Sequence, residues 1–313
     1  MAIPLLFAEK AQAQNGDPTA RAQIVHNSAD PAAEVVDIYV NGDLFVDSLA
    51  FRAATPFVDV PAATPLLFEI YPYGADPAET DAAFELAGAE FAEGETYTVI
   101  ANGLLAGGFA DNPNGINTDF NLYVLSSKEM HDNASEASLF IWHGATDAPG
   151  VDIFARDLAQ LTDDLRYLEN TTYLDVPADD YIIDIEPAGT DEVIASYAAP
   201  LSGLGEQALA VLASGFLDPS TNNDGEAFGL LAVLADGTTQ MLPATDPPAP
   251  EPALARAQIV HNSADPAAEV VDIYVNGDLF VDSLAFRAAT PFVDVPAATP
   301  LLFEIYPYGA DPA

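Results

Sequence analysis

Residues with metal-binding chemistry gather in two polar loops of this 313-residue chain. Residues 111–119 read Asp-Asn-Pro-Asn-Gly-Ile-Asn-Thr-Asp, and residues 218–226 read Asp-Pro-Ser-Thr-Asn-Asn-Asp-Gly-Glu. Calcium takes about six to eight oxygen ligands of these kinds. Neither loop has the EF-hand spacing, so a plain polar loop is the competing interpretation. The candidate calcium ligands are Asp111, Asn114, Asp119, Asp218, Asn222 and Asp224.

Three histidines occupy one equivalent position in repeated segments: His26, His143 and His261. A metal site would need a second His or Cys at ligand spacing, and the sequence offers none. We therefore expect each imidazole to hold the loop that follows it by a hydrogen bond.

Three aspartates, Asp37, Asp152 and Asp272, interrupt apolar segments. Because side chains alternate along a strand, each should lie opposite its Val and Ile neighbours and face solvent. Nothing marks a pair of carboxylates for glycoside hydrolysis. No nucleophile elbow, P-loop or dinucleotide fingerprint is present. We predict that the protein is not an enzyme, with no catalytic residue and no cofactor besides the candidate calcium.

The charge of the chain is strongly negative. Its 49 acidic residues face only 8 Lys and Arg, which gives a formal net charge of −41. Such self-repulsion is screened by salt, so the composition favours a protein adapted to salty surroundings. It argues against nucleic acid as a partner, since no basic patch can neutralise phosphates. The absence of Cys excludes disulfides, thiolate catalysis and Cys-ligated zinc.

The N-terminus carries features of an export signal. An apolar run at residues 3–8 precedes Ala11-Gln12-Ala13, a small-residue pattern of the kind that signal peptidase cuts. We expect residues 1–19 to be a signal-peptide remnant and leader, and the protein to be extracellular or on the cell surface. A disordered extension is the alternative. No later segment approaches about 18 apolar residues without charge, so no transmembrane span is predicted.

Internal repeats organise the rest of the chain. Residues 20–78 recur without change at 255–313, and a weaker repeat lies between the two copies. A period of this size indicates an array of modules. The expected domains are 20–127, 137–243 and a partial third copy at 255–313, separated by a linker at 128–136 and a Pro-rich, semi-rigid linker at 244–254.

The modules read as β-structure. Strands are predicted at residues 34–40, 66–73, 97–101 and 120–125, and Asn41-Gly42 is a strong hairpin signal. One weak helix is predicted at residues 157–167. Seven or eight short strands in roughly a hundred residues indicate a two-sheet sandwich. The predicted fold class is therefore all-β, with tandem immunoglobulin-like β-sandwich domains, two complete and one partial.

The chain resembles a known family of exported bacterial and archaeal proteins, filed as domain of unknown function 4397. The resemblance rests on residues 21–28 (Arg-Ala-Gln-Ile-Val-His-Asn-Ser), 36–42 (Val-Asp-Ile-Tyr-Val-Asn-Gly) and 54–62 (Ala-Thr-Pro-Phe-Val-Asp-Val-Pro-Ala). It implies tandem immunoglobulin-like sandwiches. It implies no activity, so no catalytic residue carries over.

The partial third copy leaves two interpretations. It lacks its last strands, so either the gene continues beyond residue 313 or an open sheet edge pairs with another chain by strand complementation. The first interpretation is the favoured one. We expect an exported structural or adhesive repeat protein, with other copies of itself or cell-surface components as partners, and the second interpretation adds filament formation. The alternative is a module that binds carbohydrate or calcium through end loops of the sandwiches.

Overall fold

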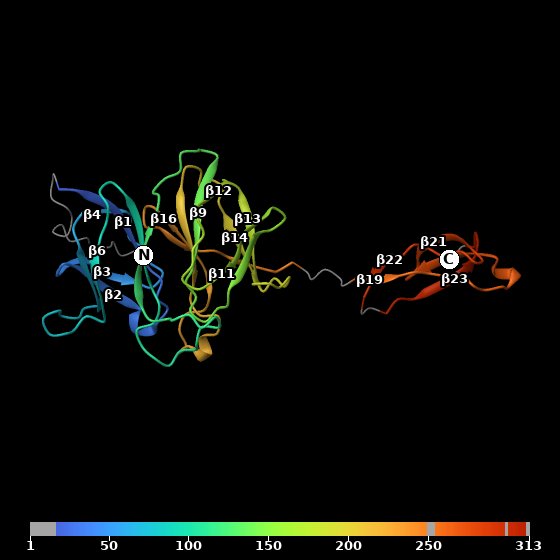
Figure 1. Cartoon of the computed structure of the whole chain (residues 1–313), viewed down its shortest axis with the longest axis horizontal. Helices are drawn as coiled ribbons and strands as arrows, with labels where there is room; N and C mark the ends of the chain where they lie inside the picture. Colours follow the sequence, from blue (N-terminus) through green and yellow to red (C-terminus); the bar gives the residue numbers. More distant parts are fainter. Residues whose placement is uncertain (1–16, 249–253, 298–299, 311–313) are drawn as a thin grey trace. The chain divides into compact units, whose positions relative to one another are not determined.

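The computed structural model describes residues 17–248, 254–297 and 300–310 (Figure 1). The chain divides into two compact units, residues 1–248 and 249–313. The structure is all-β, as predicted, with three short 3-10 turns at Pro31–Ala33, Pro219–Thr221 and Pro266–Ala268. Most of the predicted signal remnant lies outside the described residues. Among those residues, no helix is long and apolar enough to cross a membrane.

Two sheets of four strands form the first sandwich, drawn from blue to teal in Figure 1. One sheet has the order β4-β1-β7-β8, and its strands β1 and β7 are parallel. The other has the order β3-β2-β5-β6 and is antiparallel. The strands are β1 Thr19–His26, β2 Val35–Val40, β3 Asp43–Ala50, β4 Val58–Pro61, β5 Leu66–Pro72, β6 Phe84–Ala89, β7 Thr96–Asn102 and β8 Asn121–Ser126.

The second sandwich repeats this plan with a fifth strand on each sheet. The orders are β12-β9-β15-β16-β17, with β9 and β15 parallel, and β11-β10-β13-β14-β18. The strands are β9 Glu136–His143, β10 Val151–Ala155, β11 Ala159–Leu165, β12 Leu174–Pro177, β13 Asp180–Pro187, β14 Ala195–Pro200, β15 Ala208–Ser214, β16 Gly229–Leu234, β17 Thr239–Met241 and β18 Ala244–Thr245.

Residues 254–310 form a smaller version of the same arrangement. One sheet has the order β21-β20-β23, and a second pairs β19 with β22. The strands are β19 Leu254–Ala257, β20 Val270–Val275, β21 Asp278–Ala285, β22 Val293–Pro296 and β23 Phe303–Pro307. β-sandwich architecture is thus what the sequence predicted, and the immunoglobulin-like detail stays a prediction.

Local chemistry explains the hairpin that joins β2 and β3. Asn41 and Gly42 both have positive φ, 51° and 80°. A two-residue turn of this type matches the twist of the flanking strands and favours Asn-Gly. The sequence prediction at this turn is confirmed.

The helix predicted at residues 157–167 is wrong. Asp157 has a φ of 60° and lies in the middle of a tight turn between Ala155 and Ala159, after which β11 runs antiparallel to β10. A residue with left-handed φ breaks a helix at its first turn. Pairing with β10 then outweighs the weak helix propensity of the segment, which is an edge strand.

One sheet of each sandwich is buried on both faces. Along β9, Leu139 and Ile141 belong to the core of the second sandwich, whereas Phe140 and Trp142 belong to a separate cluster. This junction cluster draws on strands of both sandwiches, so the two pack face to face. It consists of Val25, Ala54, Ile100, Phe140, Trp142, Ala210, Leu212, Leu231 and Val233.

The predicted linker at 128–136 is fixed to both sandwiches. Glu129 accepts a hydrogen bond from Arg21 at 2.7 Å, and the backbone N–H of Lys128 donates to the Tyr173 hydroxyl at 2.9 Å. Met130 forms a bridge with Gln207. Of the Pro-rich linker, residues 244–245 form β18, while 249–253 lie outside the described residues.

Candidate functional site

Buried amides connect the two sandwiches at their junction. The side-chain amide of Asn27 donates to Oδ1 of Asn102 at 2.7 Å. Nδ2 of Asn102 in turn donates to the Gly144 carbonyl and the Tyr167 hydroxyl, each at 3.1 Å. Burial raises the pKa of Tyr167 well above its ordinary value. A Cβ at Gly144 would lie 2.2 Å from Asn27 Nδ2, so the close approach requires glycine here.

Two further side chains of the first sandwich bond to the backbone of the second. Gln23 donates to the Leu234 carbonyl of the second sandwich at 2.8 Å, and to the Thr55 carbonyl of its own sandwich at 2.9 Å. Arg52 donates to the carbonyls of Ser214 and Ala227, at 2.9 and 2.6 Å. These polar contacts accompany the apolar junction cluster. The directional hydrogen bonds fix the orientation of the two sandwiches, and the burial of apolar surface holds the sandwiches together.

The segments that lead into the two candidate calcium loops meet at this junction. The rings of Phe109 and Phe216, which precede the two loops, stack with centroids 5.6 Å apart. The backbone N–H of Ala110 donates to Oδ1 of Asn222 at 2.9 Å, and Nδ2 of Asn222 donates to Asp147 at 2.9 Å. The second loop is therefore bonded to the residue directly before the first.

The six candidate ligands have individual roles in these loops. Oδ1 of Asn114 accepts from the Gly150 N–H at 2.9 Å, so this oxygen and that of Asn222 already serve as hydrogen-bond acceptors. Asp119 accepts from Asn117, and Asp218 caps the turn at Pro219–Thr221. Asp111 and Asp224 are exposed. Across the described residues no group of three or more His, Cys, Asp or Glu is placed to hold a metal ion. Calcium binding stays a prediction.

Two loop-anchoring aspartates were missed in the sequence. Oδ2 of Asp30 accepts from the N–H groups of Leu105 and Ala106, at 2.8 and 3.0 Å. Asp147 does the same for Leu217 and Asp218, at 2.8 and 2.9 Å. The available signal was the repeated Asp four residues after each histidine.

The histidine prediction is confirmed. Nε2 of His26 lies 2.6 Å from the Ala33 carbonyl, and Nδ1 accepts from the Ser28 N–H at 3.3 Å. His143 and His261 make the corresponding Nε2 contacts, with Pro149 at 2.9 Å and Ala268 at 2.6 Å. A carbonyl only accepts, so Nε2 carries the proton. Burial lowers the pKa of His26 to about 4, which keeps the ring neutral near pH 7.

The prediction that the three strand aspartates face solvent is wrong. Asp37, Asp152 and Asp272 are 5, 6 and 5% exposed. The register of β2 and β3 shifts beside Asp37, and Ser48 there has a φ of 56°. Such a bulge aims a backbone N–H at the carboxylate instead of at the neighbouring strand. The donors are Ser48 and Gly74 to Asp37, Asp164 and Gly189 to Asp152, and Ser283 and Gly309 to Asp272.

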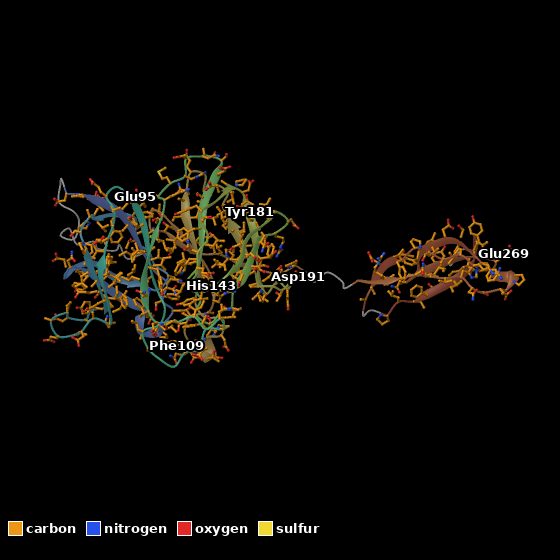
Figure 2. All side chains as sticks on the ribbon, viewed as in Figure 1. Glu95, Phe109, His143, Tyr181, Asp191 and Glu269 are labelled. Carbon is orange, nitrogen blue, oxygen red and sulfur yellow. The ribbon has the colours of Figure 1, made fainter. Side chains whose placement is uncertain are left out.

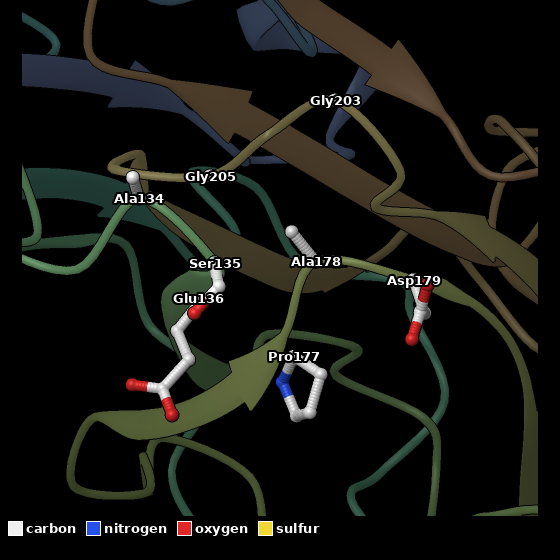
Figure 3. A pocket seen from close by; sticks show the side chains of 8 residues that line it. All are labelled: Ala134, Ser135, Glu136, Pro177, Ala178, Asp179, Gly203 and Gly205. Atoms are coloured by element: carbon white, nitrogen blue, oxygen red, sulfur yellow. The ribbon is translucent and has the colours of Figure 1, made fainter.

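An open pocket of about 610 Å³ lies in the second sandwich (Figure 3). Its charged lining residues are Glu136 and Asp179, and Ala, Ser, Pro and Gly make up the rest. Figure 3 shows these two carboxylates on opposite sides of Pro177, not directed at one another. Glu136 instead pairs with His131 at 3.3 Å. The pocket has the polarity to hold a small polar molecule.

Comparison with known proteins adds a family. The model of a domain of unknown function (DUF4397) matches residues 20–154, which cover the first sandwich and extend into β10. The match includes the three segments on which the sequence resemblance rests, and it covers less than half of the chain. No curated protein matches the chain.

One solved structure among those that match is "The Bacillus anthracis TIE protein". It is 10% identical, with a TM-score of 0.18, and the alignment covers 92% of this chain and 45% of that chain. The chain thus spans less than half the length of that protein, and a likeness at this level supports no conclusion about fold or function.

Proposed function

We propose that the chain is an exported structural or adhesive repeat protein whose working unit is a rigid pair of sandwiches. The observation that carries the proposal is the junction cluster, in which Trp142 and Leu212 are 1 and 0% exposed. Domains joined by small polar contacts move relative to one another, whereas a large apolar contact suppresses that motion. A rigid pair suits a stalk, a coat or a platform for display.

Two sequence features support a place outside the cell. One is the small-residue pattern Ala11-Gln12-Ala13 behind an apolar run. The other is the net charge of −41, which keeps a protein soluble in concentrated salt. Fractionation of the native cells tests this, with external protease applied to intact cells. Digestion of the protein while a cytoplasmic marker survives is expected, and protection of both would contradict export.

Rigidity can be measured directly because the chain has no Cys. Spin labels at Thr80→Cys and Asp191→Cys, both exposed positions in different sandwiches, should give one narrow distance distribution. The added substitution Leu212→Asp places a charge in the junction cluster and should broaden it. A broad distribution without that substitution would contradict the rigid pair.

Assembly through the third copy is the second part of the proposal. In β23, Phe303 and Ile305 are 45 and 66% exposed, whereas the same residues of β5, Phe68 and Ile70, are 2 and 0% exposed. Since residues 20–78 and 255–313 are identical, the strands that cover β5 fit β23 equally well. We therefore name a second copy of the chain as the occupant of this face, by strand complementation.

Light scattering and electron microscopy on the full chain, in molar salt, test the assembly. Ordered oligomers or filaments are expected, and Ile305→Asp should abolish them. Tyr308→Ser is the matched control, because Tyr308 is 62% exposed and its counterpart Tyr73 is 61% exposed. A monomeric wild-type chain, or disordered aggregates that ignore Ile305→Asp, would refute the assembly part alone.

The alternative function is ligand binding by end loops. The specific observation in its favour is the open pocket of about 610 Å³ beside Glu136 and Asp179, a size suited to a small ligand. Calorimetry with calcium and with a panel of glycans tests it. A heat of binding that disappears in Glu136→Gln and Asp179→Asn would support a site in this pocket. No heat of binding with calcium or any glycan would exclude it.

A further inference from the structure

The second sandwich contains an apolar cavity between its two sheets. Its volume is about 140 Å³, and its lining includes Ile153 of β10, Ile185 of β13, Ala195 of β14 and Leu230 of β16. Two other lining residues, Ile194 and Leu217, are 42 and 49% exposed, so the cavity reaches the surface beside them.

The cavity exists because one aromatic ring of the first sandwich has no counterpart in the second. In the first, Ile70 of β5 pairs with Phe84 of β6. In the second, Ile185 of β13 occupies the place of Ile70, and it pairs with Ala195. Replacing a phenylalanine by alanine in a packed interior leaves a void where neighbours do not collapse.

The neighbouring rings show the same difference. Phe84 contacts Phe120 edge to face, with centroids 5.1 Å apart, and so fills the end of the first core. Phe228 holds the position of Phe120 in the second sandwich, since Leu122 and Leu230 face equivalent alanines in β7 and β15. Phe228 lines the cavity. The void therefore matches a missing phenyl ring.

The lining of the cavity includes one titratable side chain, His143. His143 lies within the packed side chains of its sandwich (Figure 2). Its Nε2 contacts the Pro149 carbonyl at 2.9 Å, and its Nδ1 is too deeply buried for a ligand in the cavity to contact it. The surface offered to a ligand is therefore apolar.

We propose that this cavity binds a small apolar molecule built on a single aromatic ring. Empty apolar cavities of about this volume stay dry and take up benzene. A ring of this size replaces the contacts that Phe84 supplies in the first sandwich. The exposed Ile194 and Leu217 mark the entry. The site is separate from the assembly surface and from the open pocket.

Titration of the full chain with benzene and with phenol tests the site, read from methyl signals in NMR. Methyls of Ile153, Ile185 and Leu230 should shift in a saturable way. Those of Ile38 and Ile70, the matched positions of the first sandwich, should not. Benzene should bind at least several-fold more tightly than phenol, whose hydroxyl has no partner in an apolar cavity. Tighter binding of phenol would overturn the apolar character of the site, and no shift with either probe would overturn the site.

One substitution should fill the cavity in the second sandwich, and another should create the equivalent cavity in the first. Ala195→Phe should abolish the shifts and raise the melting temperature, and Phe84→Ala should create benzene-dependent shifts at Ile38 and Ile70. If Ala195→Phe does not fold, Ala195→Leu fills most of the space and serves in its place. Retention of the shifts in a folded filled variant would overturn the proposal.

Discussion

Arg52 of the first sandwich donates two hydrogen bonds to Ser214 of the second, one to the hydroxyl at 3.1 Å and one to the carbonyl at 2.9 Å. The same side chain lies over the ring of Phe51, 4.8 Å from its centroid. The third copy repeats the second contact, since Arg287 lies over Phe286 at 4.9 Å, and in the described part of the chain Arg287 has no counterpart to the first. Arg52 and Arg287 thus stand in identical local sequences, and Arg52 is the one that bridges two domains.

Arg52→Ala should destabilise the pair of sandwiches by about 2 kcal/mol, because a charged donor loses its bonds to two acceptors of buried Ser214 and one of exposed Ala227. Chemical denaturation followed by Trp142 fluorescence reports the change, since Trp142 is the single tryptophan and lies in the junction cluster. Arg287→Ala is the matched control and should leave that transition unchanged. Equal effects of the two substitutions would contradict a bridging role.

Protonation of His26 should cost stability in mild acid. Its folded pKa is about 4 and its ordinary value 6.5, so above pH 6.5 neither state is charged. As pH falls from 6.5 to 4 the unfolded chain takes up a proton that the folded chain refuses, and stability drops by about 3 kcal/mol in total.

NMR titration of the His26 ring protons in the folded protein measures this pKa. His26→Gln keeps a donor for the Ala33 carbonyl and removes the titration, so its stability should depend less on pH across the same interval. A folded-state pKa near 6.5 would contradict the prediction.

Asp37→Asn should destabilise the first sandwich by about 1–3 kcal/mol. Each carboxylate oxygen accepts one backbone N–H, from Ser48 and Gly74, both at 2.8 Å. An amide keeps one acceptor and turns donors toward the other N–H, which then stays unpaired. Asp43→Asn, at an exposed position of β3, is the control for lost charge. Denaturation curves that coincide for the two variants would show that the buried carboxylate is dispensable.

Stability should rise with salt. The 49 acidic residues repel one another in the compact state, and molar salt shortens the screening length to about 3 Å. The melting temperature should climb from low to molar sodium chloride and then level off. A melting temperature that does not change over this interval would refute the self-repulsion argument.

The elements were predictable where a local pattern decides them. Asn41-Gly42 requires two positive φ angles wherever it occurs in a hairpin, and His26 precedes a loop that needs a donor. The predicted strand at 97–101 lies within β7, whose β-branched and aromatic residues are visible in the sequence. Such features depend on neighbours in the chain, so one sequence suffices to find them.

Features that depend on pairing partners were missed. Asp37 of β2 is buried because of a bulge in the neighbouring strand β3. The sequence of β2 alone does not reveal this register shift. The joining of the sandwiches had a signal that was not used. Continuous apolar runs such as residues 208–213 and 229–234 indicate strands covered on both faces, and here the second cover is another domain.

The duplicated segment gives the chain two peptides of one composition in two surroundings. Leu-Leu-Phe-Glu-Ile-Tyr-Pro occurs at 66–72 and again at 301–307, and Ile70 is 0% exposed while Ile305 is 66% exposed. In hydrogen–deuterium exchange these peptides share one mass and elute together. A single protein population would therefore give a two-peaked isotope envelope, and a merging of the peaks toward slow exchange would report that the third copy had been covered.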